Sequence, residues 1–282
     1  MTNEAAGAAK RIAKQLPVRL REHKLTLVSA GVAFYAFLAF VPTLIVIVTV
    51  YGLVAKPADI QRQVHDVAKA LPDEVQNFIQ QQITSIGHAS GTRVSVALVI
   101  AVALALWSAS GGVAALVTGV SVARDQTEPK SFVKKRGKAL ALTAGAIVLL
   151  VVMIFLIAAV PSILAKAGLG TTGRVLFDIL RWPLLAIVIV LGLGVLYRVA
   201  VEQPKQARLG LVTPGTLVAT LLWLTASGLF AVYTANFASY SKTYGSLASI
   251  VVVLLWLYLS AIAVLIGAEI DGISTASPMH AT

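Results

Sequence analysis

Six long apolar blocks most strongly constrain the fold of this chain. Each is about as long as the roughly 20 residues that a helix needs to cross a hydrocarbon core of about 30 Å. The blocks cover residues 25–54, 94–120, 140–164, 182–200, 211–237 and 247–268. Hydrophobic residues make up 58% of the chain and charged residues only 12%, whereas about a quarter of the residues in soluble domains are charged. The sequence therefore predicts an all-α, polytopic membrane protein with six transmembrane helices.

The basic residues indicate how these spans are oriented. Most of the 23 Lys and Arg residues precede the first block, or lie between blocks two and three or between blocks four and five. An excess of Lys and Arg near span ends marks the cytoplasmic side, so both termini are expected in the cytoplasm. The run KSFVKKRGK at 130–138 should attract anionic lipid headgroups. It has a single aromatic residue, Phe132, and so offers no platform for stacking bases; no specific nucleic-acid partner is expected.

The spans divide the chain into three parts. Residues 1–24 form a basic cytoplasmic segment, residues 25–272 a six-helix membrane domain, and residues 273–282 a small, polar and mobile cytoplasmic tail. Between the first two spans, residues 55–93 carry apolar side chains at helical spacing. We expect two amphipathic helices in this outer, periplasmic loop. They form either a cap on the bundle or a surface that docks an envelope protein partner.

The residue types that catalysis needs are sparse. The chain has no cysteine, and its four histidines lie at positions 23, 65, 88 and 280 without the spacing of metal ligands. A hydrolytic zinc site needs three such ligands and an open position. We therefore expect no metal, no cofactor and no enzymatic activity.

Candidate site residues are the glycine, proline, hydroxyl, amide and aromatic residues that interrupt the apolar sequence, together with one acid. They either pack helices closely or line a pathway for a ligand. They are Gly31, Tyr35, Pro42, Ser108, Ser110, Gly111, Gly112, Thr216, Thr220, Trp223, Ser227, Asn236, Tyr240, Tyr244, Tyr258 and Glu269.

The first two spans contain two of these groups. Gly31, Tyr35 and Pro42 recur at helical spacing and are expected to form one inward-facing stripe, with Pro42 bending the first span. In the second span, WSASGG at 107–112 has almost no side chain for most of a turn. A neighbouring backbone or a substrate can approach closely there, and close helix packing is the commoner role of such a surface.

The fifth and sixth spans contain the other groups. A row of residues that includes Thr216, Thr220 and Ser227 shares one face of the fifth span, which either packs against other helices or lines a polar cavity. Tyr258, deep in the sixth span, needs a partner for its hydroxyl. Glu269 either lies in the interface, solvated or paired with a basic residue, or turns inward as a gate or coupling residue. Asp271 is assigned to the tail.

Three segments together resemble the YihY/BrkB family of bacterial inner-membrane proteins. They are SAGVAFYAFLAFVPTL at 29–44, the run from WSASGG at 107–143, and the run from TPGTLVATLLWL at 213–271. The resemblance implies six transmembrane helices in a bacterial inner membrane. Ala39 stands where family members often have serine, and Ser121 where asparagine is common, so no family role passes to these two side chains.

Two functional hypotheses of different classes follow. The family has been linked by name to ribonuclease activity and to virulence or serum resistance, but the sequence offers no acid, base or metal ligands for RNA hydrolysis. In the first hypothesis the protein is a transporter or lipid-handling protein that acts on an amphipathic envelope molecule. In the second it is a non-transporting membrane scaffold that docks partners through its outer loop or its basic loop.

Overall fold

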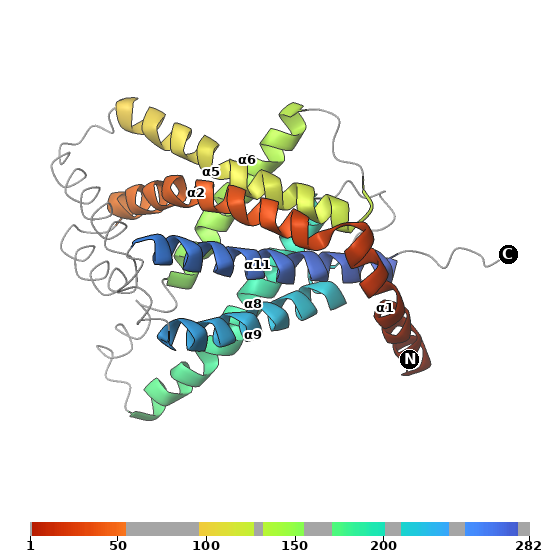
Figure 1. Ribbon diagram of the computed structural model, residues 1–282. Helices are drawn as coiled ribbons and strands as arrows, with labels where there is room; N and C mark the ends of the chain where they lie inside the picture. Colours follow the sequence, from red (N-terminus) through yellow and green to blue (C-terminus); the bar gives the residue numbers. More distant parts are fainter. Residues whose placement is uncertain are drawn as a thin grey trace.

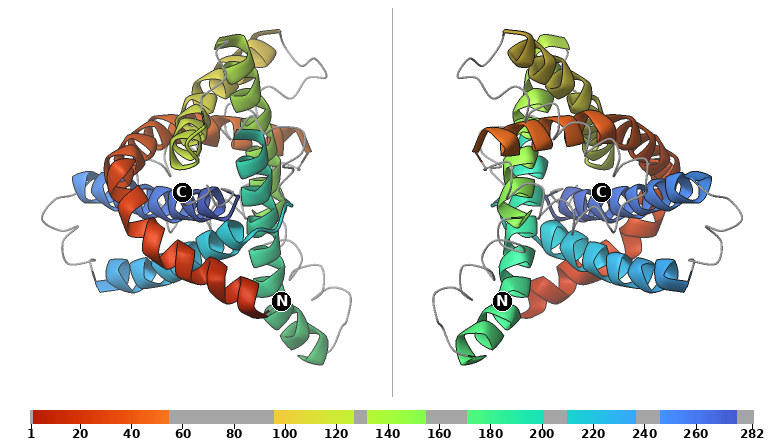
Figure 2. Two further views of the ribbon diagram at one scale, coloured as in Figure 1. Left: turned by 90° about the vertical axis from the view of Figure 1, so that its right-hand side faces the viewer. Right: turned by 90° about the vertical axis from the view of Figure 1, so that its left-hand side faces the viewer.

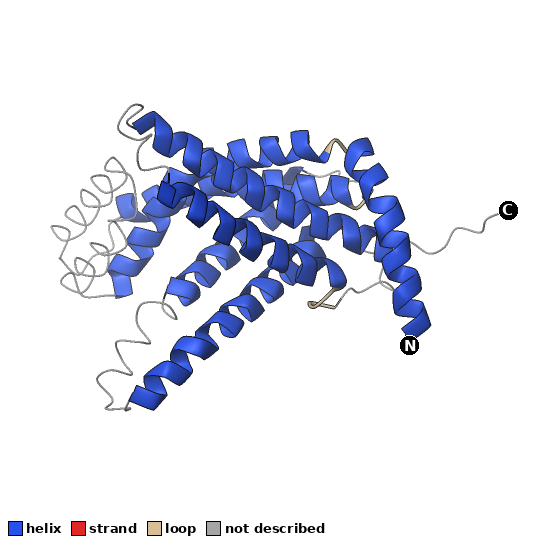
Figure 3. Ribbon diagram, turned by 60° about the horizontal axis from the view of Figure 1, so that its bottom comes forward, coloured by secondary structure: helices blue, strands red, loops and turns tan. Residues whose placement is uncertain are grey.

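The described part of the chain is helical throughout. The computed structural model describes residues 2–54, 96–126, 132–154, 171–200, 210–236 and 246–275. Its helices are α1 (Thr2–Glu22), α2 (Leu25–Val54), α5 (Val96–Ala123), α6 (Phe132–Ile154), α8 (Thr171–Ala200), α9 (Pro214–Asn236) and α11 (Ser246–Thr275). Figure 3 shows helices and a few short loops, and no strand, in these ranges. The predicted all-α class is confirmed.

Every predicted apolar block contains one long helix. α2, α5, α6, α8, α9 and α11 fall on the six blocks in order, with α6 and α8 each starting earlier than predicted. Within the described residues, four helices are long and apolar enough to cross a membrane, or up to five if the bent pair α1–α2 counts as one span. The count of six spans stays a prediction. The predicted outer loop, residues 55–93, lies outside the described residues, as do Tyr240 and Tyr244.

The helices converge at one end of the molecule. α2 packs against α5, and α11 packs against both α9 and α2, while α6 and α8 cross behind them (Figure 1). The largest apolar cluster combines the end of α5, the end of α8 and the second half of α11. Its buried members are Leu25, Val117, Val120, Ala123, Leu196, Tyr197, Ala200, Leu265 and Ala268. The first helix, α1, and the end of α11 lie at this end (Figures 1 and 2).

The N-terminal segment is a helix that turns sharply into α2. The axes of residues 9–22 and 25–40 differ by 64°. Lys24 adopts the left-handed conformation, with φ 47°, and its amide donates to the Arg21 carbonyl over 3.1 Å. The Lys24 carbonyl in turn accepts from the amides of Leu27 and Val28. One residue therefore ends α1 and begins α2, which the sequence analysis had treated only as a basic segment before the first span.

Two expectations for the helix faces and ends are wrong. Gly31 and Tyr35 do not face inward: Gly31 has no atom within 4 Å of an added Cβ, and Tyr35 is 53% exposed. The buried face of α2 instead contains Ser29, Val32 and Ala39, because small residues allow α5 to approach. The tail does not begin at residue 273 either, since α11 continues through Thr275.

α9 and α11 cross where two glycines meet. A Cβ added to Gly267 would lie 2.5 Å from the Gly215 carbonyl oxygen and 2.6 Å from both the Ala219 Cβ and the Tyr197 hydroxyl. Most of these neighbours are backbone or short side chains that cannot move aside. The two helices can therefore approach this closely only if both positions lack a side chain.

Replacing Gly267 with alanine should lower the free energy of unfolding by about 1–3 kcal/mol through overpacking. The matched control is Gly228→Ala in α9, where an added Cβ meets nothing within 4 Å; it should be neutral or stabilising by up to about 1 kcal/mol. Thermal unfolding in detergent measures both. Equal melting temperatures for the two variants would contradict the close approach of α9 and α11 at Gly267.

Candidate functional site

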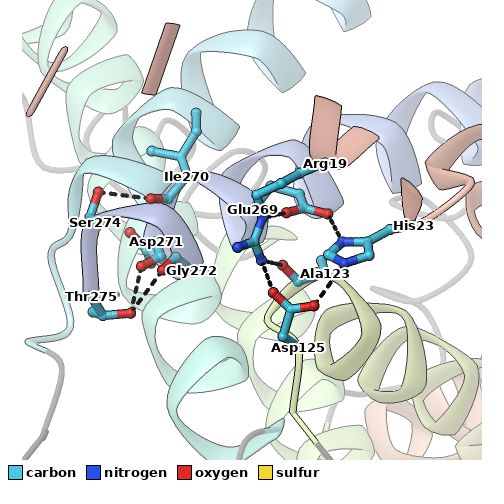
Figure 4. A network of polar contacts seen from close by, with 10 residues as sticks. All are labelled: Arg19, His23, Ala123, Asp125, Glu269, Ile270, Asp271, Gly272, Ser274 and Thr275. Carbon is cyan, nitrogen blue, oxygen red and sulfur yellow. Dashed lines mark hydrogen bonds and ion pairs between the residues drawn. The ribbon is translucent and has the colours of Figure 1, made fainter. Parts of the chain in front are cut away.

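A buried carboxylate occupies the end of α11. Glu269 is 0% exposed, and Arg19 of α1 donates from Nε to its Oε2 over 2.8 Å. His23 Nδ1 lies 2.5 Å from Oε1 of the same carboxylate. Figure 4 shows both side chains pointing at Glu269, Arg19 from the last turns of α1 and His23 from the residue that follows it. Glu269 is therefore buried, as the inward alternative expected, and it is paired with basic residues, as the interfacial alternative expected. A role as a gate or coupling residue stays a prediction.

Asp125 joins the same residues from the end of α5. Its Oδ2 lies 2.5 Å from Arg19 Nη2 and its Oδ1 lies 2.8 Å from His23 Nε2. Arg19 Nη2 also donates to the Ala123 carbonyl over 3.3 Å. The Asp125 side chain is 58% exposed, in contrast to that of Glu269. We refer to Arg19, His23, Asp125 and Glu269 as the ionic network, and to this end of the helices as the network end.

The backbone at the end of α5 positions Asp125. The Gln126 amide donates to the Ser121 carbonyl over 3.0 Å and the Asp125 amide to the Val122 carbonyl over 3.1 Å, the pair of bonds that defines a Schellman motif. Asp125 takes the left-handed position of that motif, with φ 52°. Glycine usually stands there, and Asp is one of the few other residues that tolerate it. The end of α5 therefore accepts some backbone strain and gains a carboxylate aimed at Arg19 and His23.

The charges of the ionic network balance when His23 is protonated. Burial lowers the pKa of His23, but its hydrogen bonds and ion pairs with Glu269 and Asp125 outweigh this effect and raise the pKa above the usual 6.5. Two cations then face two carboxylates. Such pairing offsets the large cost of burying the Glu269 charge.

A second carboxylate, Asp271, caps α9. Its Oδ2 accepts from the Thr213 hydroxyl over 2.7 Å and its Oδ1 from the Gly215 amide over 2.8 Å. Thr213 and Thr216 also exchange hydrogen bonds between backbone amides and hydroxyls, as N-cap and N3 residues do. A carboxylate at this position is favoured by the helix dipole. The assignment of Asp271 to the tail is wrong, because it is 1% exposed and joins α11 to the start of α9.

Two further contacts attach α8 to this end. The Tyr197 hydroxyl donates to the Val264 carbonyl of α11 over 2.5 Å. Arg124 is buried, and its Nη1 donates to the Tyr197 carbonyl over 3.4 Å. Polar groups thus join the end of α11 directly to α1, α8 and α9, and the end of α5 is joined to it through Arg19 and His23.

The hydroxyl row of α9 packs near the network end. Thr216 and Thr220 are buried, and each donates to a carbonyl of its own helix. Farther along, the Trp223 indole donates to the Ser260 hydroxyl over 3.0 Å and meets Trp256 edge to face. The next member of the row, Ser227, is only half-buried. The first half of the row is therefore a packing surface, and the second half is partly open.

The small-residue turn of α5 divides in the same way. Gly112 packs so closely on α2 that an added Cβ would lie 2.9 Å from the Ala39 Cβ. Ser110 is buried and donates to the Trp107 carbonyl over 2.6 Å. Ser108 is exposed, and Gly111 has nothing within 4 Å of an added Cβ. Only the buried part of this turn brings α5 against α2.

The remaining candidates are dispersed. Pro42 is half-buried within the continuous helix α2, and the predicted bend there stays a prediction. Tyr258 is half-buried in α11. Asn236 is the last residue of α9, and its side chain is not among those described. The structure does not bring these residues together with Glu269.

Sequence reasoning missed three members of the ionic network. Arg19 was used only as one of the basic residues that indicate topology, and His23 only as a histidine outside any metal-ligand spacing. Asp125 was not singled out. A usable signal existed, since Glu269 is an acid at the apolar end of a span and requires a cationic partner. Across the described residues, no group of three or more His, Asp or Glu side chains is arranged to hold a metal ion. Because Arg19 and His23 hold both carboxylates, the network is suited to fixing helix positions.

Glu269→Gln should destabilise the protein by about 3–5 kcal/mol, because it leaves buried cations without their counter-charge. Asp125→Asn should cost only about 0–1 kcal/mol, because its side chain is more than half exposed. Asn tolerates the left-handed backbone as Asp does, so this control changes the charge alone. Unfolding in detergent measures the stability of both variants. An equal loss in the free energy of unfolding would argue against the burial of Glu269.

The contribution of His23 to stability should depend on pH. The pKa of His23 is raised in the folded protein. Its contribution to the free energy of unfolding is therefore fully present below the unfolded pKa near 6.5, and it is lost as the pH rises through the pKa of the folded state. The melting temperature of the unchanged protein should therefore exceed that of His23→Gln most strongly at acid pH and converge with it at alkaline pH. A difference between the two melting temperatures that grows as the pH rises would contradict this prediction.

The sequence model for the family described as Virulence factor BrkB matches residues 16–278. The chain is 30% identical over 265 residues to a putative ribonuclease-like protein, YfkH, of Bacillus subtilis (strain 168), covering 92% of this chain and 94% of that protein. It is 45% identical over 80 residues to a UPF0761 membrane protein of Alteromonas mediterranea, which is 28% of this chain and 26% of that protein. A UPF0761 membrane protein of Xanthomonas oryzae pv. oryzae is 39% identical over 75 residues, 27% and 17% of the respective chains.

No solved structure matches the chain. The family match covers nearly the whole chain and includes Arg19, His23, Asp125 and Glu269. It also includes all six long apolar helices. The resemblance drawn from the three sequence segments is confirmed, and the chain belongs to the BrkB virulence-factor family of membrane proteins.

Proposed function

We propose that this protein moves or presents an amphipathic envelope lipid across a bacterial inner membrane. In this proposal α2, α5, α6, α8, α9 and α11 form six spans, and the network end faces the cytoplasm. The basic residues of α1 lie at that end, which is the side where Lys and Arg accumulate. The ionic network and the Asp271 cap then form the closed, cytoplasmic end of the bundle.

The observation that carries the proposal is the change in burial along α9 and α11. Near the network end, these helices bury Thr213–Thr220 and Ala261–Ile273 in large part. No residue from 221 to 234 or from 250 to 260 is buried, and the structure describes all of these positions. The outer halves of the two helices are thus loosely covered, whereas their inner halves are tightly packed.

The chemistry of this loosely covered region suits an amphipathic ligand. Large apolar side chains of α9 and α11 are exposed there on the side of Ser227, among them Leu224 and Val251. Hydroxyl and indole groups lie beside them, with Trp223 bonded to Ser260 and Ser227 half-buried. Acyl chains favour the first kind of surface, and the polar part of a lipid favours the second.

The direct test reconstitutes the protein in liposomes with fluorescently labelled lipids. Movement is measured as the fraction of label that a membrane-impermeant quencher reaches. The protein should raise this fraction above that of protein-free liposomes. Ser227→Trp should reduce the rate severalfold by filling the half-buried face of α9. Leu229→Trp is the matched control, because Leu229 is 69% exposed on the opposite side of the helix, and its rate should not change.

Failure to move lipids of several headgroup classes would overturn the proposal and favour the scaffold hypothesis instead. The ribonuclease-like name of the Bacillus subtilis relative gives no support for catalysis here. We propose that the protein is not an enzyme, because the acids of the network end are held by Arg19 and His23 or by the start of α9. RNA hydrolysis by the purified protein would contradict this part of the proposal.

A further inference from the structure

An arginine of α6 contacts the middle of α5 far from the network end. The guanidinium carbon of Arg136 lies 4.0 Å from the centroid of the Trp107 ring. Its Nη2 donates to the Trp107 carbonyl over 2.6 Å. Trp107 belongs to the candidate membrane span Ala103–Ala123. At 1.5 Å per residue, Trp107 is about 25 Å along the helix axis from Asp125.

This position differs from the one expected from sequence. The run 130–138 was expected to lie as a basic loop at the cytoplasmic surface, but residues 132–138 belong to α6. α6 crosses α5 so that Arg136 reaches an apolar span (Figure 1). A cation beside an apolar span is costly to keep and is a common sign of a functional site.

The bonding capacity of Arg136 is only partly used. A guanidinium has five N–H donors, and one of them donates to the Trp107 carbonyl. Its Nε is buried without a hydrogen-bond acceptor among the described residues. No ion pair joins it to a carboxylate in the described ranges, where Glu269 and Asp125 pair with Arg19 and His23. Among the residues that the structure describes, the stacked guanidinium therefore has no negative partner.

An apolar stripe continues from Trp107 away from the network end. Ile100, Leu104 and Trp107 follow each other at spacings of four and three residues and so share one face of α5. They are 54%, 64% and 49% exposed, respectively. A positive group thus stands at one end of an exposed apolar surface. This arrangement matches a lipid with an anionic headgroup and an acyl chain, and it offers nothing to a free anion beyond Arg136.

We propose that Arg136 and Trp107 bind the phosphate of an anionic membrane lipid, with the acyl chain lying on Ile100 and Leu104. Guanidinium pairs with phosphate through two parallel N–H bonds, while the flat face of the guanidinium stays on the indole. The inference rests on the proposed lipid-handling function and names the headgroup class. It assigns the headgroup to the α5–α6 crossing instead of the α1 surface.

The test measures quenching of tryptophan fluorescence by lipids brominated in their acyl chains. Subtracting the signal of Trp107→Phe isolates the contribution of Trp107 from those of the other three tryptophans. Brominated phosphatidylglycerol should quench Trp107 at about tenfold lower mole fraction than brominated phosphatidylcholine, the preference expected for one charge-assisted contact.

Two variants of Arg136 and one control sharpen the test. Arg136→Gln should abolish the preference, and Arg136→Lys should lose most of it, because lysine keeps the charge but not the planar fork. Arg21→Gln removes the same charge from an exposed position on α1 and should keep the preference. Thermal unfolding checks that each variant is folded.

Equal quenching of Trp107 by the two lipids, or a preference that survives in both Arg136 variants, would overturn the site. Loss of the preference in millimolar inorganic phosphate would show a free-anion site and would also overturn it. The readout is binding, so it is separate from movement. If Trp107 prefers phosphatidylglycerol but the protein moves no lipid, the proposed transport is refuted and the binding site stands. If the protein moves lipid but Trp107 shows no preference, the transport stands and the binding site is refuted.

Discussion

The ion pairs of Glu269 are the interaction on which the rest of the structure depends. An ionised carboxylate with no exposed surface is tolerable only when cations and hydrogen bonds surround it. Arg19 and His23 supply both from the turn between α1 and α2. The same two side chains hold Asp125 at the end of α5. The position of α1, the 64° turn and the end of α5 are therefore set together by one buried charge.

The sequence places Asp271 two residues beyond Glu269, on the other side of α11. Glu269 points toward Arg19 and His23, and Asp271 points toward the start of α9. The hydroxyl of Tyr197 attaches α8 one turn earlier. Polar contacts fix the spacing of these helix ends, and two facing glycines allow α9 to cross α11 closely. Away from this end, the described contacts are mainly apolar and less constraining.

This asymmetry connects the fold to the proposed function. A rigid, closed end leaves the outer halves of α9 and α11 free to contact lipid, with Trp223, Ser260 and Ser227 as polar groups on an otherwise apolar surface. The stacked pair Arg136–Trp107 adds a positive charge at the crossing of α5 and α6. Together they provide the two kinds of surface that a phosphate-bearing lipid requires, one for its chain and one for its headgroup.

The sequence by itself determined the six long apolar helices, though not the basic helix α1, because long apolar blocks depend only on local hydrophobicity and length. It also identified Glu269 as an exceptional charge and the family to which the chain belongs. It did not determine which side of α2 is buried. Gly31 and Tyr35 have the spacing of a packing stripe, but the stripe through Ser29, Val32 and Ala39 lets α5 approach more closely.

Only the tertiary structure decided the partners of the charged residues. Arg19, His23, Asp125 and Glu269 come from three segments separated by about a hundred residues or more, and no local pattern encodes such a meeting. Asp271 looked like a tail residue because its bonding partners lie at the start of α9, far away in sequence. Arg136 looked like a surface charge because the crossing of α5 by α6 is not a property of either helix. Secondary structure follows from local chemistry, whereas charge pairing depends on how the helices are assembled.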